Sequence, residues 1–143
     1  MSKPNENDPL FEEFIAFKCG AFAGLKYEIT PRNTEYDFML RNETDIKVLG
    51  EIKTRNKWFQ DWFIDQKKYD WLMKACPLFR CAPWYVIHCE KDRNTYQINL
   101  HHIECARNGS MYGQPGIFVP IEQWRVIPQI ASSYKGMKEL DWK

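Results

Sequence analysis

The segment Glu35–Arg55, with the sequence EYDFMLRNETDIKVLGEIKTR, decides the fold. Two largely apolar runs flank the polar stretch Asn42–Asp45, a pattern that predicts two strands joined by a tight turn. Glu51 and Lys53 are separated by one residue, so in a strand both side chains point to the same face. If the two strands pair around the turn, Asp37 lies across from them. Two carboxylates and an ammonium then converge on one spot.

This constellation suits the hydrolysis of a phosphodiester. A divalent cation held by carboxylates can generate a nucleophilic water and stabilise charge on the phosphoryl oxygens. A lysine beside the cation can orient the water and stabilise the developing charge. Asp37, Glu51 and Lys53 supply that minimum set, and the carbonyl of Ile52 is available as a neutral ligand. We therefore expect a Mg²⁺ site, in which Mn²⁺ can substitute.

Composition favours one folded domain over the whole chain, residues 1–143. The 143 residues include 44% hydrophobic and 15% aromatic side chains, enough for a core and against disorder. The sequence contains no apolar run of about 18 residues, so we expect no membrane span. The polar N-terminus MSKPNENDPL has no apolar segment of a secretory signal. These features predict a protein of the cytosol, either bacterial or that of a host cell.

Cysteine and histidine patterns leave one alternative metal site open. The five cysteines are irregularly spaced, which favours reduced thiols. A zinc site would need two tight ligand pairs, which the sequence lacks. The residues that could form such a site are Cys89, His101, His102 and Cys105.

The net charge of +1 is unevenly distributed. Residues 1–52 carry 6 basic and 10 acidic side chains, whereas residues 53–80 carry 7 basic and 3 acidic ones. An acidic pocket beside a basic strip fits a metal-dependent enzyme that acts on a polyanion. A solvated helix face with ordinary lysines would give the same pattern.

The N-terminal part predicts a helix followed by strands. Asp8 and Pro9 form a helix start, and Gly24 is placed to end the helix. Alternating residues predict a strand over Leu25–Thr30, a turn follows at residues 31–33, and two strands span Tyr36–Arg41 and Ile46–Thr54. Gly50 would permit a bulge that re-aims Glu51.

Further along, a second helix is predicted from Asp61, as its cap, to Ala75, with Pro77 as its stop. Its face would carry Trp62, Gln66, Tyr69, Met73 and Cys76. A buried strand over Trp84–His88 and a strand over Thr95–Leu100 follow. The last expected elements are a short helix at His101–Arg107, a loop at 109–116, a strand at Ile117–Pro120 and a helical turn at Ile121–Trp124.

Asp37 followed by Glu51-Ile52-Lys53 resembles the motif of the PD-(D/E)xK nuclease superfamily. The resemblance covers roughly residues 9–90 and departs from the motif at Tyr36, where proline is usual. It implies an α/β (α+β) fold with a restriction-endonuclease-like αβββαβ core, in which helices flank a central mixed sheet. Residues 91–143 would then be a C-terminal elaboration of the single domain.

The resemblance also implies further site residues. Members similar to archaeal Holliday-junction resolvases carry a glutamate on the first helix, and Glu13 has a similar spacing to Gly24 here. It is the expected extra catalytic residue and metal ligand, with Glu12 as the alternative. Many superfamily nucleases place Gln and Tyr on the helix after the acid-x-lysine strand. Gln66 and Tyr69 resemble that pair and could approach the substrate; both also fit the edge of a core.

Nucleic-acid contacts are expected from the basic, aromatic strip after the motif. Lysines and arginines meet phosphates, and exposed aromatic rings stack on unpaired bases. The strip's substrate-binding candidates, besides Gln66 and Tyr69, are Arg55, Lys57, Trp58 and Lys67. Further candidates are Lys68, Lys74 and Arg80 for phosphates and Phe59 and Trp62 for stacking, although Trp62 also fits the core.

The sequence therefore predicts a Mg²⁺-dependent DNA nuclease, with RNA left open as a substrate. An endonuclease on branched or duplex DNA, of a phage-like recombination or repair type, is the first hypothesis. An exonuclease or a restriction-type endonuclease would share the chemistry, and two-fold cuts on duplex DNA would favour a homodimer. A non-catalytic nucleic-acid-binding or protein-interaction module that keeps the fold is the alternative from another class.

Overall fold

The computed structural model describes residues 9–30 and 35–128. The predicted cap Asp8, the predicted turn at residues 31–33 and the chain after Pro128 lie outside the described residues.

Six strands form a central mixed sheet in the order β1-β2-β3-β5-β6-β9. Strands β3 and β5 run parallel, and the other neighbours in this sheet are antiparallel. The predicted strands of residues 25–54 and 84–100 are confirmed within one or two residues of their ends. The strands are β1 (Lys26–Ile29), β2 (Phe38–Arg41), β3 (Ile46–Arg55), β5 (Ala82–Cys89), β6 (Asn94–Asn99) and β9 (Arg125–Ile127).

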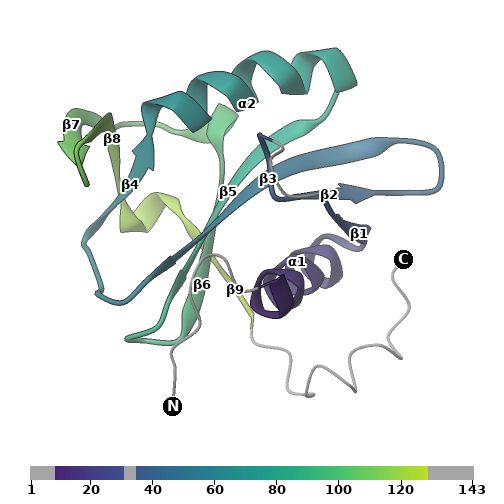
Figure 1. The fold of residues 1–143 in the computed structure, drawn as a ribbon, viewed down its shortest axis with the longest axis horizontal. Coiled ribbons are helices and arrows are strands. Elements are labelled where there is room, and N and C mark those ends of the chain that lie inside the picture. Colours follow the sequence, from purple (N-terminus) through teal and green to yellow (C-terminus); the bar gives the residue numbers. More distant parts are fainter. Residues whose placement is uncertain (1–8, 31–34, 129–143) are drawn as a thin grey trace.

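Two helices cover the two faces of the sheet, as Figure 1 shows. On one face α1 (Pro9–Ala23) packs Ile15 and Cys19 against Val48 and Ile52 of β3. On the other face α2 (Gln66–Phe79) packs against the odd-numbered side chains of β3 and β5. The predicted fold class, a mixed central sheet flanked by helices, is confirmed.

A second, three-stranded sheet stands beside the first, and the sequence did not predict it. It has the order β4-β8-β7, with β4 at Asp61–Asp65, β7 at Arg107–Met111 and β8 at Gln114–Pro120. The core order is thus αβββαβ with β4 inserted before α2. The predicted helix start at Asp61 is wrong, because residues 61–65 pair antiparallel with β8.

Helix α2 begins and ends later than predicted. Asp65 is its cap, since the Asp65 carboxylate accepts the Lys68 N–H at 3.2 Å. Pro77 lies inside the helix and does not stop it. Its missing N–H costs one hydrogen bond in the last turn. The helix ends at Arg80 with φ 55°, where the N–H groups of Arg80 and Cys81 bond to the carbonyls of Pro77 and Cys76.

The segment after β6 also differs from the prediction. Instead of a helix over His101–Arg107 there is a single 3₁₀ turn, Leu100–His102. Residues 109–116, predicted as a loop, contribute to the β7–β8 hairpin. The strand at Ile117–Pro120 is confirmed as part of β8, and the helical turn at 121 is confirmed as a 3₁₀ turn, Ile121–Gln123.

A buried cluster of three polar residues lies between α1 and the central sheet. Lys18, only 4% exposed, donates to the Thr95 hydroxyl at 3.0 Å, and His88 Nδ1 lies 2.9 Å from the same hydroxyl. Burial and the ammonium of Lys18 lower the pKa of His88 to about 4. The imidazole is therefore neutral in the folded protein at neutral pH.

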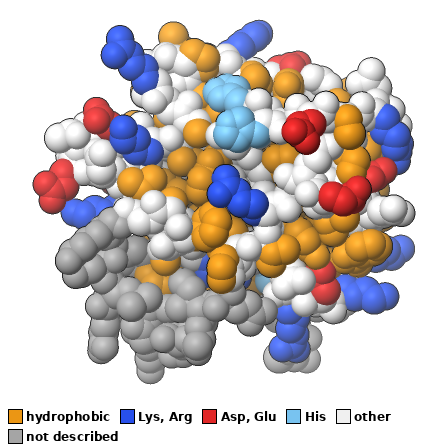
Figure 2. Space-filling model, turned by 180° about the vertical axis from the view of Figure 1, so that it is seen from behind, with side chains coloured by type: hydrophobic (Ala, Val, Ile, Leu, Met, Phe, Trp, Pro, Cys, Tyr) orange, Lys and Arg blue, Asp and Glu red, His pale blue; other side chains and the backbone are white. Residues whose placement is uncertain are grey.

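Basic and acidic side chains are interspersed on the face turned away from the view of Figure 1, as Figure 2 shows. Among the described residues, no helix has the length and apolar character needed to cross a membrane.

Candidate active site

The β2–β3 hairpin positions the site. Its turn is fixed by the Asn42 side chain, which accepts the N–H groups of Thr44 and Asp45 at 2.9 and 2.7 Å. The predicted bulge at Gly50 is wrong, because the register shifts between Leu40 and Arg41 instead. Gly50 has a different role: it lies directly under the buried Phe38 ring, where any Cβ would stand 2.3 Å from ring carbons.

Asp37 stands where β2 begins to part from β3. Its N–H donates to the Gly50 carbonyl at 2.8 Å, and its carbonyl accepts the Thr30 N–H at 3.1 Å. Its carboxylate Oδ2 accepts the backbone N–H of Ile52 at 2.8 Å. The carboxylate therefore occupies the position on β3 that the backbone of β2 has left. The carbonyl of Ile52 points to the same side as its N–H, as expected within a strand.

Glu51 and Lys53 share one face, as predicted. The Lys53 ammonium lies 3.4 Å from Glu51 Oε2, and the Glu51 residue is only 3% exposed. A second ammonium, that of Lys68 on α2, lies 3.3 Å from Glu51 Oε1. Burial, reinforced by the negative charge of Asp37, raises the pKa of Glu51 to about 8 despite both lysines.

Two carboxylates and a backbone carbonyl fit a Mg²⁺ ion. Mg²⁺ prefers oxygen ligands and is commonly bound through one or two carboxylates while retaining several waters. The unfavourable burial of Glu51 beside Asp37 is the electrostatic situation that a bound cation would relieve. No cluster of three or more His, Cys, Asp or Glu side chains in residues 9–30 and 35–128 is arranged to hold a metal.

Glu13, the expected extra ligand, is engaged elsewhere. Its Oε2 accepts a hydrogen bond of 2.7 Å from the Tyr27 hydroxyl on β1. Glu12, the alternative, is half-buried in the first turn of α1. The structure therefore does not assemble either glutamate with Asp37 and Glu51 into a group of metal ligands.

Helix α2 brings a lysine to the carboxylates, and not the predicted Gln66 and Tyr69. Gln66 donates to Asp70 at 2.9 Å, Tyr69 packs against the core on the α2 side, and Lys67 is exposed. Lys68 is the residue of α2 that reaches the site, and its ammonium also donates to the Glu35 carbonyl at 2.7 Å. The sequence indicated Lys68 only as a phosphate contact; a cap at Asp65 instead of Asp61 would have put Lys68 in the first turn, beside β3.

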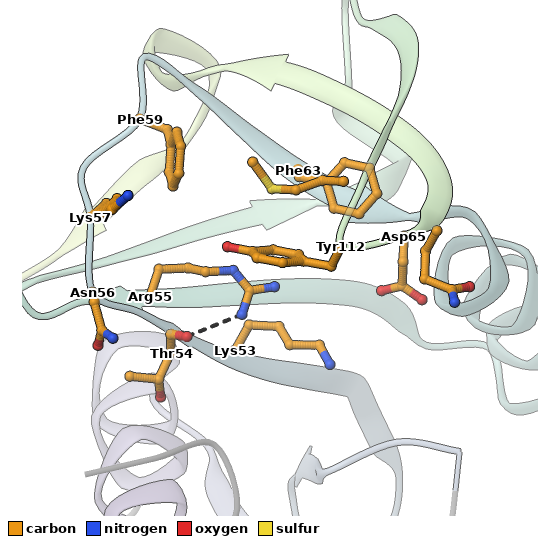
Figure 3. A pocket seen from close by; sticks show the side chains of 11 residues that line it. Lys53, Thr54, Arg55, Asn56, Lys57, Phe59, Phe63, Asp65 and Tyr112 are labelled. Carbon is orange, nitrogen blue, oxygen red and sulfur yellow. Dashed lines mark hydrogen bonds between the residues drawn. The ribbon is translucent and has the colours of Figure 1, made fainter. Parts of the chain in front are cut away.

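The basic strip after the motif lines a pocket of about 730 Å³, drawn in Figure 3. Lys53 and Arg55 from β3 and Lys57 from the following loop contribute to its wall. The Arg55 guanidinium donates to the Thr54 carbonyl at 3.1 Å and lies 5.0 Å from the centre of the Tyr112 ring. Trp58 is 47% exposed beside this strip but is absent from the lining.

Asp65, the acid that lines the pocket, is already hydrogen-bonded. Its Oδ1 accepts the hydroxyl of the fully buried Tyr85 at 3.0 Å, while its other oxygen caps α2. Asp65 and Tyr85 thus tie the start of α2 to β5, beneath the site. Sequence reasoning did not single out either residue.

The alternative zinc site does not form in the described part of the chain. Cys89 is buried and its thiol donates to the Lys57 carbonyl at 3.6 Å, whereas Cys105 is exposed and contacts Gln123 at 3.0 Å. All five cysteines are free thiols.

Two nucleases share this fold. The Holliday junction resolvase Hjc of Archaeoglobus fulgidus is similar with a TM-score of 0.56 at 9% identity, over 78% of this chain and 88% of Hjc. A nuclease from a fusellovirus is similar with a TM-score of 0.51 at 12% identity, over 82% of this chain and 80% of the viral protein. The resemblance to PD-(D/E)xK nucleases expected from the sequence is thus confirmed at the level of the fold.

Comparisons of the sequence alone found no relative. No protein-family model matches the chain. No curated protein matches it significantly.

Proposed function

We propose that this protein is a Mg²⁺-dependent DNA nuclease, and that it acts as an endonuclease on branched or duplex DNA. The observation that carries the proposal is the grouping of Asp37, Glu51 and Lys53 where β2 parts from β3. The shared fold supports it, because one similar structure is described as a Holliday junction resolvase and the other as a nuclease.

In this proposal Asp37, Glu51 and the Ile52 carbonyl hold the metal. The bound Mg²⁺ supplies Lewis-acid stabilisation of phosphoryl oxygens and lowers the pKa of a bound water. The Ile52 N–H orients the Asp37 carboxylate through the 2.8 Å hydrogen bond. Glu51 orients the Lys53 ammonium, which donates to a phosphate oxygen and stabilises charge that develops there.

The test is a gel assay of four-way junction, flap, single-stranded and duplex DNA with Mg²⁺, Mn²⁺ or EDTA. Wild-type protein should cleave with either metal and not with EDTA. The variants Asp37→Asn, Glu51→Gln and Lys53→Met should each lose at least about 100-fold in rate. Glu28→Gln is the matched control, because Glu28 is an acid on β1 that pairs with Arg41 at the surface. Wild-type rates in the three site variants would refute the assignment.

One feature favours a second function, a DNA-binding module without turnover. Lys68 already places an ammonium 3.3 Å from Glu51 Oε1, so the site contains a cation of its own chain. Thermal unfolding in increasing Mn²⁺ separates the two functions. A metal-binding site predicts a rise in Tm that disappears in Glu51→Gln, whereas the binding module predicts DNA binding without that rise.

Glu13 is tested in the same experiment. If α1 supplies a metal ligand in the DNA complex, Glu13→Gln will weaken the Mn²⁺ response and slow cleavage. The contact between Glu13 and Tyr27 predicts instead a loss of stability without a change in metal affinity.

A further inference from the structure

The pocket beside Lys53 combines cations with flat apolar groups. Its walls come from the end of β3, the loop after it, β4 and the tip of the β7–β8 hairpin. Aromatic rings and a thioether face basic groups across it, as Figure 3 shows. The apolar residues of the lining are Phe59, Phe63, Met111 and Tyr112, and the basic ones are Lys53, Arg55 and Lys57.

Tyr112 is held in this pocket by an unusual backbone conformation. It has φ 54° and is followed by Gly113 with φ 74°, so the two residues form the tight turn between Met111 and Gln114. Two successive positive φ angles are the signature of a type I′ hairpin turn, where Asn and Gly are favoured and a bulky aromatic is rare. The turn keeps the Tyr112 ring over Arg55 while leaving it 65% exposed.

The β7–β8 hairpin that carries Tyr112 is fixed to β4 in the three-stranded sheet. Five residue pairs join β8 to β4, and five join β8 to β7. A Cβ at Gly116 would lie 2.3 Å from the Ile64 carbonyl oxygen, so the two backbones are in close contact there. The ring of Tyr112 is therefore presented by a fixed support.

From these contacts, and resting on the nuclease function proposed above, we propose that the pocket receives a single unpaired nucleotide of the DNA next to the cleaved phosphate. Its base stacks on the Tyr112 ring, and its phosphate contacts Arg55 and Lys57. The protein is thus selective for DNA with a nucleotide outside the helical stack.

Three arguments favour an unpaired nucleotide as the occupant of the pocket. A volume of about 730 Å³ lies in the range of about 300–1,000 Å³ that small ligands occupy. A base can stack on a side-chain ring only when it has left the duplex stack, since paired bases are covered on both faces. The one acid of the lining, Asp65, is bonded to Tyr85 and to the backbone of α2, so basic groups dominate the charge presented to a phosphate.

The place of the pocket couples it to the reaction. Lys53 belongs both to the lining and to the ion pair with Glu51, so a nucleotide bound there adjoins the site of hydrolysis. Such a position selects where a strand is cut without a base-specific contact.

The test measures binding of the full-length protein in EDTA, which prevents cleavage. The two probes are duplexes that carry 2-aminopurine either as a single unpaired nucleotide or paired within the same sequence. Wild-type protein should prefer the unpaired probe and change its fluorescence, because stacking on an aromatic ring alters the emission of the base. Tyr112→Asn removes the ring but suits the positive φ, so the hairpin is retained. It should reduce the preference by roughly 5- to 150-fold.

Phe79→Ala is the control, because Phe79 is an aromatic ring 50% exposed at the far end of α2. It should leave the preference unchanged, and Tyr112→Phe should retain it. Equal wild-type affinity for the two probes, or an equal loss on both in Tyr112→Asn, would overturn the inference. Cleavage of both probes in Mg²⁺ would then still support the nuclease. Selective binding without any cleavage would overturn the nuclease alone.

Discussion

Substituting Gly50 by alanine tests whether the contact between Phe38 and β3 positions Asp37. The added Cβ would lie 2.3 Å from the Phe38 ring, whereas ordinary contact begins at 3.4 Å, so ring and strand must separate by about 1 Å. Phe38 is fully buried in the cluster that also contains Ile15, Ala16 and Cys19 of α1. We therefore expect β2 to move away from β3, and Asp37, the neighbour of Phe38, to move with it.

We expect Gly50→Ala to lower both the stability of the protein and the rate of cleavage. Overpacking of this kind destabilises by about 1–3 kcal/mol, measurable by urea unfolding. Misplacement of a catalytic group by about 1 Å can reduce the rate by about 100-fold, measurable as Mg²⁺-dependent cleavage at saturating DNA. Both losses should appear in Gly50→Ala at a temperature where the variant remains folded.

The decisive control is the double variant Gly50→Ala with Phe38→Leu. The smaller leucine makes room for the new methyl group, so the losses of the two single variants should not add, and part of the activity should return. Unchanged stability in Gly50→Ala would contradict the packing shown here. A fall in stability with full activity would show that the ring yields without moving Asp37.

Three further outcomes follow from buried polar groups. Burial lowers the pKa of His88 to about 4, so between pH 6.5 and 4 the unfolded chain binds a proton that the folded chain does not bind. The contribution of His88 to stability should therefore be complete above pH 6.5 and decrease as the pH falls toward 4. In urea unfolding at pH 5 and 7, His88→Gln should reduce this pH dependence. Asp65→Ala should cost about 2–4 kcal/mol, since it removes a helix cap and leaves the Tyr85 hydroxyl buried without its acceptor, and Asp65→Asn should cost less. In EDTA at pH 9, above the raised pKa of about 8, Glu51→Gln should raise Tm, because it removes a charge buried beside Asp37, and in Mg²⁺ the same variant should lose cleavage; a lower Tm in EDTA at pH 9 would mean that the ammonium groups around the carboxylate already compensate it.

The sequence predicted well where local signals and tertiary packing agree. The β2–β3 hairpin has a polar turn that its own Asn42 side chain closes, and the side chains of Glu51 and Lys53 share a face by strand geometry alone. Gly24, with φ 72°, follows the end of α1 as predicted. These features depend on residues close together in the chain.

The prediction failed where distant pairing decides the structure. Residues 61–65 have a spacing compatible with a helix, but pairing with β8, more than 50 residues away, makes them a strand. The same error put the helix cap four residues too early, so Lys68 was predicted as a phosphate contact and not as a neighbour of Glu51. Gly and Pro in residues 109–116 suggested a loop, yet Pro115 is tolerated on β8 because it pairs with β7 beyond the part of the strand that β4 covers.

Strand β4 is inserted between β3, which carries Glu51, and α2. It separates the residues that we propose to bind the metal from the hairpin that we propose to contact the nucleotide. Glu51 and Lys53 belong to the central sheet and Asp37 directly precedes its strand β2, whereas the hairpin of residues 107–120 belongs to the second sheet and pairs with β4. Its turn could be lengthened, shortened or exchanged without altering any residue that we propose to hold the cation. Variation in what such a scaffold cuts can therefore accumulate at one surface turn while the hydrolytic chemistry stays constant.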